Sequence, residues 1–197
     1  MGFRVLARQQ YLARALAAAA AALALTACGG GDGAQSGGEQ DHNQADVTFL
    51  QGMIPHHDQA IEMSQLAEDR TDSEQLLELA SEIEGAQGPE IETMTSLLEE
   101  FGADVPSTGM GGMDHSSMGG MQGMMSPQQM EGLEQLSGRE FDQAFLQMMI
   151  EHHQGAITSS ETVLQEGQNP AVDDLAGQII EAQQAEIEEM SAMLPQG

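Results

Sequence analysis

Residues 49–61 read FLQGMIPHHDQAI, and residues 145–157 read FLQMMIEHHQGAI. The two stretches lie at an offset of 96 positions and share 9 of their 13 residues. The same offset places residues 79–98 on residues 175–194 without a gap, with 10 identities in 20 positions. Self-similarity at a fixed spacing indicates an internal duplication. We therefore expect two copies of one structural unit.

Each copy is predicted to form two helices joined by a short turn. In the second copy Met149, His153 and Ile157 belong to a set that recurs at three- and four-residue steps, the period of an amphipathic helix. Between the matched blocks stand Thr71-Asp72-Ser73 in one copy and Asn169-Pro170 in the other, which are turn and N-cap signals. Two hairpins that each expose one apolar stripe can bury these stripes against each other. The predicted fold is an all-α four-helix bundle built from two duplicated helix hairpins.

Two prolines and the composition test this fold assignment. Pro55 and Pro89 fall inside predicted helices, where a proline removes a hydrogen bond, and we expect local kinks at both instead of helix ends. Aromatic residues make up only 3% of the chain and Trp is absent. A β-sandwich depends on aromatic and β-branched residues, so the composition also favours helices.

The chain is strongly acidic, with 32 Asp and Glu residues against 5 Lys and Arg and a formal charge of -27. Such a surface repels phosphate backbones and anionic lipid headgroups. Nucleic-acid binding and docking to membranes through basic residues are therefore excluded. Metal cations remain plausible partners.

The N-terminus carries an export signal. Arg4, Arg8 and Arg14 precede the apolar run at residues 16–25, which is too short for an ordinary membrane span. This run ends in Leu25-Thr26-Ala27-Cys28, which resembles the bacterial lipoprotein signal. We expect a signal peptide at residues 1–27 and lipidation of Cys28, the only cysteine in the chain. An ordinary signal peptide with a chance cysteine is the alternative.

The remaining chain divides by composition. Residues 28–44 are rich in Gly, Gln, Ser and Asp and are predicted to form a flexible tether. The folded domain is expected at residues 45–197, with a Met/Gly-rich loop at residues 102–126 between the two copies. The mature protein would be held at a bacterial membrane through its lipid, facing the periplasm or the cell exterior.

The repeated Met-x-x-His-His block with a following Ala-Ile, and the Gln-x-x-Glu-Ile-x-x-Met block downstream, resemble a bacterial family. This is the ferritin-like family of four-helix proteins known as domain of unknown function 305. The resemblance covers residues 46–194, nearly the whole folded part. It implies a ferritin-like bundle, and some exported members of the family bind copper. The chain departs from the family pattern in lacking a Trp near the end of each half, which concerns a packing contact more than the site.

The duplicated residues form a candidate metal site in the bundle. Adjacent helical side chains point about 100° apart, so His56 and His57 cannot both face the bundle axis. Each histidine pair follows a methionine by three residues, and the second helix of each copy adds a carboxylate and a thioether on one face. The candidate ligands are His56, His57, His152, His153, Met53, Met149, Glu90, Glu186, Met94 and Met190.

Two other interpretations of these bundle residues remain open. The histidines could be buried residues that hydrogen-bond to the Gln-x-x-Glu motif, with the methionines serving as packing. A carboxylate-bridged di-iron centre is disfavoured, because such bundles use Glu-x-x-His and neither copy contains that spacing.

The loop between the copies indicates which metal to expect. Its thioethers lie in a Gly-rich run that offers them no core, so packing does not explain them. Soft sulfur ligands select Cu(I), whereas imidazole accepts Cu(I) or Cu(II). Copper is therefore the predicted metal, and iron or zinc is the alternative. The interpretation without a metal is that the loop is a plain Met-rich linker or that its methionines serve to take up oxidants. The candidate ligands in the loop are Met110, Met113, His115, Met118, Met121, Met124 and Met125.

The function predicted from the sequence is copper binding by an exported lipoprotein, for sequestration, tolerance or handover. Its partners are a metal ion and the membrane that holds the Cys28 lipid. No nucleophile and base are spaced for catalysis, so an enzyme is not predicted. A metal-dependent oxidase of ferritin-like type and an acidic envelope or adhesion protein without metal are the alternatives.

Overall fold

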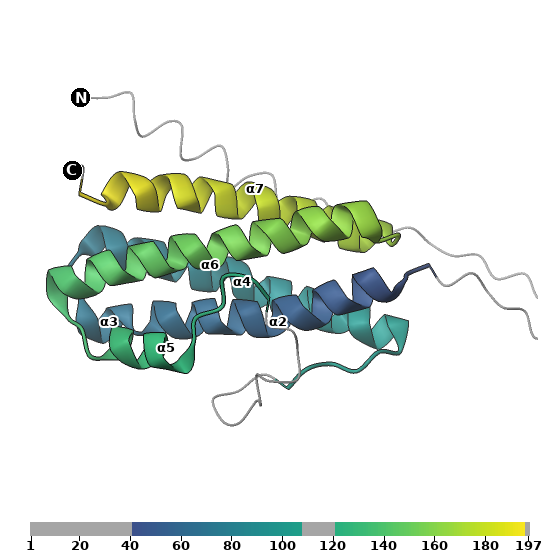
Figure 1. Cartoon of the computed structure of the whole chain (residues 1–197), viewed down its shortest axis with the longest axis horizontal. Coiled ribbons are helices and arrows are strands. Elements are labelled where there is room, and N and C mark those ends of the chain that lie inside the picture. The colour runs from purple at the N-terminus through teal and green to yellow at the C-terminus, as the bar shows by residue number, and fades with distance from the viewer. Residues whose placement is uncertain (1–40, 108–120, 196–197) are drawn as a thin grey trace, which may run out of the picture. The chain divides into compact units, whose positions relative to one another are not determined.

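The computed structural model describes residues 41–107 and 121–195. Within these residues all regular structure is helical, and the duplicated hairpins of the predicted all-α bundle are confirmed. Helices α2 and α4 form the first hairpin, α6 and α7 form the second, and α2 packs on α6 between them (Figure 1). The helices are α2 (Gln44–Gln65), α3 (Ala67–Arg70), α4 (Glu74–Phe101), α5 (Pro127–Glu134), α6 (Gly138–Glu166) and α7 (Pro170–Met193).

Local sequence explains where the long helices begin and end. Ser73 caps α4, and Asn169 caps α7 with Pro170 at its first turn, as the turn signals predicted. Helix α4 ends at Phe101 and is capped by Gly102, whose φ of 68° suits a residue without a Cβ. Helices α2 and α4 continue through Pro55 and Pro89, so neither proline ends a helix.

The folded domain begins earlier than the sequence predicted. The tether was expected to reach residue 44, but Asn43 forms a capping box with Asp46 at the start of α2. The His42 ring stacks on Phe101 at 4.0 Å, and the Asp41 carbonyl accepts a hydrogen bond from Asn169. These polar residues satisfy helix ends and therefore do not form a solvated linker. The predicted signal peptide, Cys28 and residues 28–40 of the tether lie outside the described residues.

A polar layer divides the bundle core into two apolar clusters. One cluster lies around Phe141, Phe145 and Leu76, and the other around Phe49, Leu50 and Ile179. Between these clusters each long helix contributes polar side chains, which we call the His layer. Its members are His56, His57, Gln87, Glu90, His152, His153, Gln183 and Glu186.

The segment before α5 differs from the predicted solvent-exposed loop. Residues 121–125, which we call the docked segment, pack on α2 and α6. Met125 is only 4% exposed and belongs to an apolar cluster, so the expectation that packing could not explain the loop methionines is wrong for this residue. The bundle supplies the core that the Gly-rich segment lacks. Helix α5, which follows, was not predicted.

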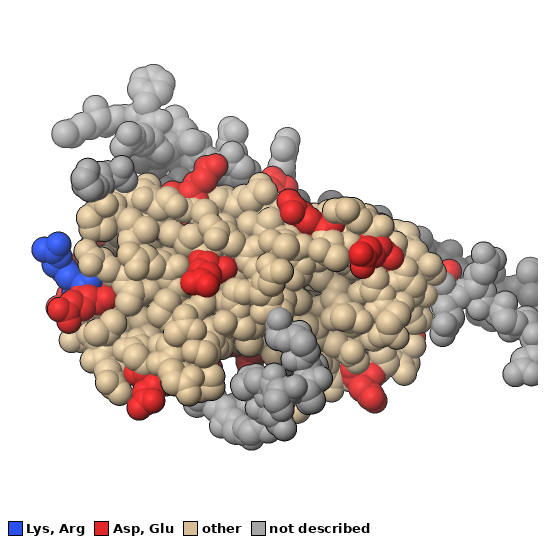
Figure 2. Space-filling view, in the orientation of Figure 1, with Lys and Arg blue, Asp and Glu red and all other residues tan. Residues whose placement is uncertain are grey.

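The described surface is acidic. Figure 2 shows carboxylates spread over the visible face, and Arg70 and Arg139 are the only Lys or Arg residues in the described part of the chain. None of the described helices is long and apolar enough to cross a membrane.

Candidate metal centre

Two histidines face each other where the hairpins meet. His56 of α2 and His152 of α6 have ring centroids 3.7 Å apart, with planes inclined at 35°. Both side chains are fully buried. The two rings occupy equivalent positions of the duplicated sequence, so the bundle brings the two copies of the motif into direct contact.

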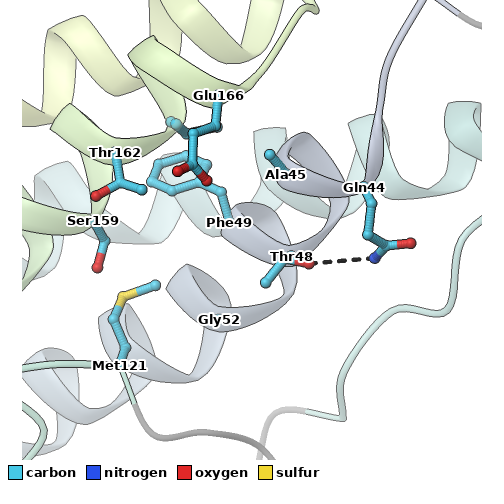
Figure 3. Close-up of a pocket in the computed structure, with 10 residues that line it drawn as sticks. Gln44, Ala45, Thr48, Phe49, Gly52, Met121, Ser159, Thr162 and Glu166 are labelled. Carbon is cyan, nitrogen blue, oxygen red and sulfur yellow. Dashed lines mark hydrogen bonds between the residues drawn. The ribbon is translucent and has the colours of Figure 1, made fainter.

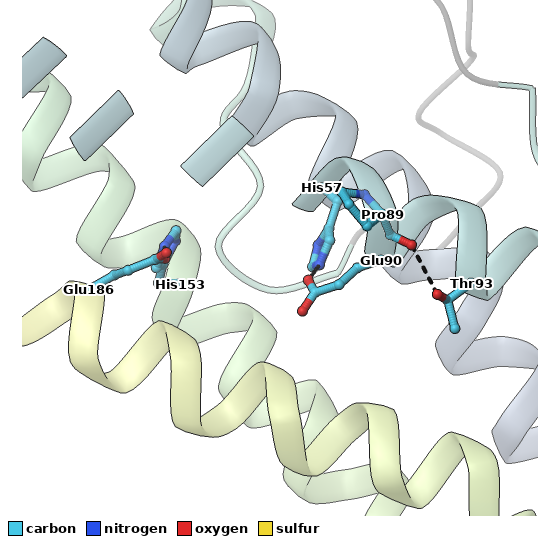
Figure 4. Close-up of polar contacts among 6 residues, drawn as sticks. All are labelled: His57, Pro89, Glu90, Thr93, His153 and Glu186. Atoms are coloured by element: carbon cyan, nitrogen blue, oxygen red, sulfur yellow. Dashed lines mark hydrogen bonds and ion pairs between the residues drawn. The ribbon is translucent and has the colours of Figure 1, made fainter. Parts of the chain in front are cut away.

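The neighbouring histidines point into their own hairpins, as the 100° separation on a helix predicts. His57 Nε2 lies 2.7 Å from Glu90 Oε2, and His153 Nε2 lies 2.6 Å from Glu186 Oε2 (Figure 4). The centroids of His57 and His153 are 6.5 and 6.3 Å from those of their neighbours in the central pair. The layer is therefore a central His pair flanked by two His–Glu pairs.

Pro89 precedes Glu90 in the first copy, whereas Ala185 holds this position in the second. Figure 4 shows the Pro89 carbonyl accepting a hydrogen bond from Thr93 Oγ1, at 2.9 Å. The two His–Glu distances differ by only 0.1 Å, from 2.7 to 2.6 Å. Pro89 in α4 thus leaves the His57–Glu90 distance close to that of the equivalent His153–Glu186 pair.

The central histidines are neutral at physiological pH. Burial, reinforced by the neighbouring His57, lowers the pKa of His56 to about 3. Burial and the facing His56 ring lower the pKa of His152 well below 6.5. A neutral imidazole presents a lone pair on one nitrogen, which is the form that binds metal.

Hydrogen bonds determine which ring nitrogens carry the lone pairs. The Gln122 carbonyl lies 3.2 Å from His56 Nε2 and can only accept, so this nitrogen carries the hydrogen. A carboxylate oxygen likewise accepts, which places a hydrogen on Nε2 of His57 and of His153. The neutral His56 therefore carries its lone pair on Nδ1, and Nδ1 is the ring nitrogen of His57 and of His153 that lies outside the His–Glu hydrogen bond.

These available nitrogens are buried without a hydrogen-bond partner among the described residues. His152 has no such partner at either ring nitrogen, and the side-chain amides of Gln87 and Gln183 also lack one. Leaving a buried polar group unsatisfied costs about 1–3 kcal/mol, so a cluster of them calls for water or an ion. Neutral imidazole nitrogens fit a transition-metal ion.

The predicted bundle methionines do not converge on one point. Met53 and Met94 belong to the cluster on one side of the His layer, and Met149 and Met190 to the cluster on the other. All four are fully buried. In the described residues, no group of three or more His, Cys, Asp or Glu side chains is placed to hold a metal ion.

Only part of the predicted loop site is described. Met121 and Met124 are half-buried and Met125 is buried. The candidate ligands that lie outside the described residues are Met110, Met113, His115 and Met118.

Sequence reasoning missed two groups near the His layer. One is the Gln122 carbonyl, for which a sequence contains no signal. The other is Gln59, whose side chain bonds to both backbone polar groups of Met125 at 2.7 and 2.9 Å. Its counterpart in the second copy is Gly155, and this difference between otherwise matching stretches was a usable signal.

Comparison with known proteins identifies the relatives of this bundle. The sequence model of the family described as "Domain of unknown function (DUF305)" matches residues 46–194. A DUF305 protein from Streptomyces coelicolor is 31% identical with a TM-score of 0.65, over 76% of this chain and 91% of that one. CopM in its Cu(II)-bound form is 30% identical with a TM-score of 0.63, over 75% and 94%. CopM structures also include Cu(I)-bound, Ag-bound and apo forms.

A curated relative matches over a shorter stretch. Uncharacterized protein L153 of Acanthamoeba polyphaga mimivirus is 44% identical over 55 residues. This match covers 28% of the chain and 36% of the viral protein, so it spans about a third of that relative's length.

Proposed function

The chain belongs to the DUF305 family, and we propose that it binds copper at the facing His56 and His152 rings. The observation that carries this proposal is a pair of buried, neutral imidazoles in contact, with nitrogen lone pairs that no described group satisfies. Binding of an ion would satisfy them.

The residues of the His layer have different roles in this proposal. His56 Nδ1 and one ring nitrogen of His152 hold the ion, and Nδ1 of His57 and of His153 is the nitrogen through which each flanking ring would add a ligand. Glu90 and Glu186 accept hydrogen bonds from the flanking rings and so fix their orientation and tautomer. Met53 and Met149 stand one helical turn before the central rings and offer soft sulfur on either side of the layer.

Copper is favoured over zinc or iron by the ligand types. Thioethers select Cu(I), and imidazole accepts either oxidation state of copper. The CopM relative was crystallised with Cu(I), Cu(II) and Ag, which are ions that this combination of ligands suits. Without carboxylates bridging the centre, the His layer lacks the ligands of a di-iron site.

A purely structural His layer would explain only part of the geometry. It accounts for the His57–Glu90 and His153–Glu186 pairs, which are ordinary buried hydrogen bonds. It does not account for His152, which is fully buried and whose ring nitrogens make no well-formed hydrogen bond in the described residues, because the His56 backbone offsets only a small part of the effect of burial on its pKa. The central pair is therefore the part of the layer that favours metal binding.

We further propose that the protein acts in the cell envelope as a lipoprotein, with Cys28 as its anchor. Copper would be sequestered for tolerance or held for handover, without catalytic turnover. The Met-rich residues between the copies would add a softer site for Cu(I).

Copper titration of the full chain tests the proposal. Cu(I) is titrated anaerobically against a chromophoric chelator, and Cu(II) is titrated separately. His56→Gln with His152→Gln should remove the bundle site for both ions. His42→Gln is the matched control, because His42 stacks on Phe101 outside the layer and should leave binding unchanged. Equal copper binding by the double variant and the control would refute the assignment.

A further inference from the structure

The docked segment covers the central His pair on the seam between α2 and α6. Its Gln122 carbonyl accepts the hydrogen bond of His56 Nε2 at 3.2 Å. Three residues later, Met125 is held to Gln59 by two hydrogen bonds of 2.7 and 2.9 Å through its backbone N–H and carbonyl. The segment is therefore fixed at both the ring and the helix surface.

Two glycines allow the segment to approach this closely. Gly123 has a φ of 85°, and a Cβ there would lie 2.8 Å from the His152 carbonyl oxygen. A Cβ on Gly155 would collide with the backbone of Gln122 and lie 2.8 Å from the Gly123 nitrogen. The backbones of the docked segment and α6 are thus in contact where only glycine fits.

The docked segment contacts two of the four positions at which the two copies differ. The stretches at residues 49–61 and 145–157 differ at only four of 13 positions. Two of these differences contact the segment: Gly52, where Met121 packs, and the pair formed by Gln59 and Gly155. One copy has been adapted to bind this segment and the other to make room for it.

The segment spans the His layer from one apolar cluster to the other. Met125 is buried in the cluster around Phe141, whereas Met121 packs against the cluster around Phe49. Met121 also borders a pocket of about 470 Å³ between α2 and α6, with Phe49, Ser159, Thr162 and Glu166 (Figure 3). This open space gives the Met121 end of the segment room to move aside.

We propose that the docked segment is a gate that controls the exchange of metal at the His56–His152 pair. The inference rests on the proposed function and adds its regulation. Closed, the segment holds the His56 hydrogen on Nε2 and covers the seam. Open, it uncovers both rings at the seam between α2 and α6. The gate sets the rate of metal exchange and leaves the number of ligands in the bundle unchanged.

Release of Cu(I) from the loaded full chain to excess bathocuproine disulfonate tests the gate. Gly155→Ala adds the colliding Cβ, and Gln59→Ala removes the two hydrogen bonds that hold Met125. Gly177→Ala is the matched control, because it makes the same change in a helix with no atom within 4 Å of the added Cβ. Loss of the two hydrogen bonds in Gln59→Ala corresponds to roughly a thirtyfold increase in the fraction of molecules in which the gate is open.

We expect both test variants to release Cu(I) at least about tenfold faster than the wild type, with unchanged stoichiometry. The Gly177→Ala control should release it at the wild-type rate. Equal release rates in the wild type, Gln59→Ala and Gly155→Ala would overturn the gate. Gln59→Ala keeps the test decisive if Gly155→Ala does not fold.

A second arm of the experiment uses no metal. Diethyl pyrocarbonate modifies accessible imidazoles. Mass spectrometry measures the rate at which His56 and His152 are modified in the apo protein. Both test variants should be modified faster than the wild type and the control. Faster modification without any copper binding would refute the proposed function alone. Copper binding with unchanged modification and release would refute the gate alone.

Discussion

Acidification from pH 7.5 to 5.0 should destabilise the apo protein through its central histidines. His56 titrates at about 6.5 in the unfolded chain, but burial lowers its pKa to about 3 in the folded state. Between these values the unfolded state binds a proton that the folded state does not. The free energy of unfolding therefore falls as the pH drops below 6.5, and is restored above it.

The magnitude follows from the two pKa values. At pH 7.5 the unfolded His56 is mostly neutral, and its contribution to the pH dependence is under about 0.1 kcal/mol. At pH 5.0 the proton bound by the unfolded chain costs the folded state about 2 kcal/mol. His152 shifts in the same direction and adds to the loss.

Carboxylates act in the opposite direction. Burial raises the pKa of Glu62 and of Glu84, with neighbouring acids as a further cause, so the folded state takes up these protons first. Their contribution to stability grows as the pH falls. The change in the free energy of unfolding on acidification must therefore be compared between proteins that share these carboxylates, so that their contribution cancels.

Urea unfolding of apo wild type, His56→Gln and His42→Gln, followed by circular dichroism at pH 7.5 and 5.0, measures this difference. The wild type and His42→Gln should lose about 2 kcal/mol more on acidification than His56→Gln does. A chelator keeps all samples free of metal. Parallel losses in all three proteins would show that His56 is not a buried neutral histidine, and the argument for its free lone pair would fail.

Three further predictions concern the lipid anchor, the carboxylate beside His57 and the loop methionines. Cys28→Ser should move the protein from the membrane to the soluble fraction, because each buried methylene of an acyl chain contributes about 0.8 kcal/mol; unchanged membrane retention would contradict lipidation. Glu90→Gln should weaken copper affinity by roughly tenfold to a hundredfold in a competition titration, because it removes the carboxylate that orients His57, whereas exposed Glu92→Gln should not. Replacing Met110, Met113 and Met118 of the loop with Leu should lower the Cu(I) capacity, while Cu(II) binding by the bundle persists. An unchanged Cu(I) capacity would show that these loop methionines do not bind copper.

The duplication made the fold and the His layer accessible from the sequence. Because the two His-His motifs occupy equivalent positions in each hairpin, packing the hairpins brings His56 against His152. The i, i+3 pattern on the second helices likewise placed Glu90 and Glu186 beside the flanking histidines. Side-chain identity and helical period are sufficient for these contacts.

The remaining features depend on backbone groups. A backbone carbonyl, that of Gln122, determines the tautomer of His56, and every residue type carries the same carbonyl. The early start of α2 was readable from Asn43 and Asp46, which match a capping box, but the polar composition around them favoured a tether. Met125 is buried by α2 and α6, which are remote from it in the sequence.

Copper is expected to bind between His56 and His152. A crystal structure of the copper-loaded full chain, with data collected on either side of the copper absorption edge, would locate the ion. We predict an anomalous peak within bonding distance of His56 Nδ1 and a His152 ring nitrogen, inside the bundle. A fully loaded protein with no anomalous density at this pair, or with copper confined to the segment between the two copies, would contradict it.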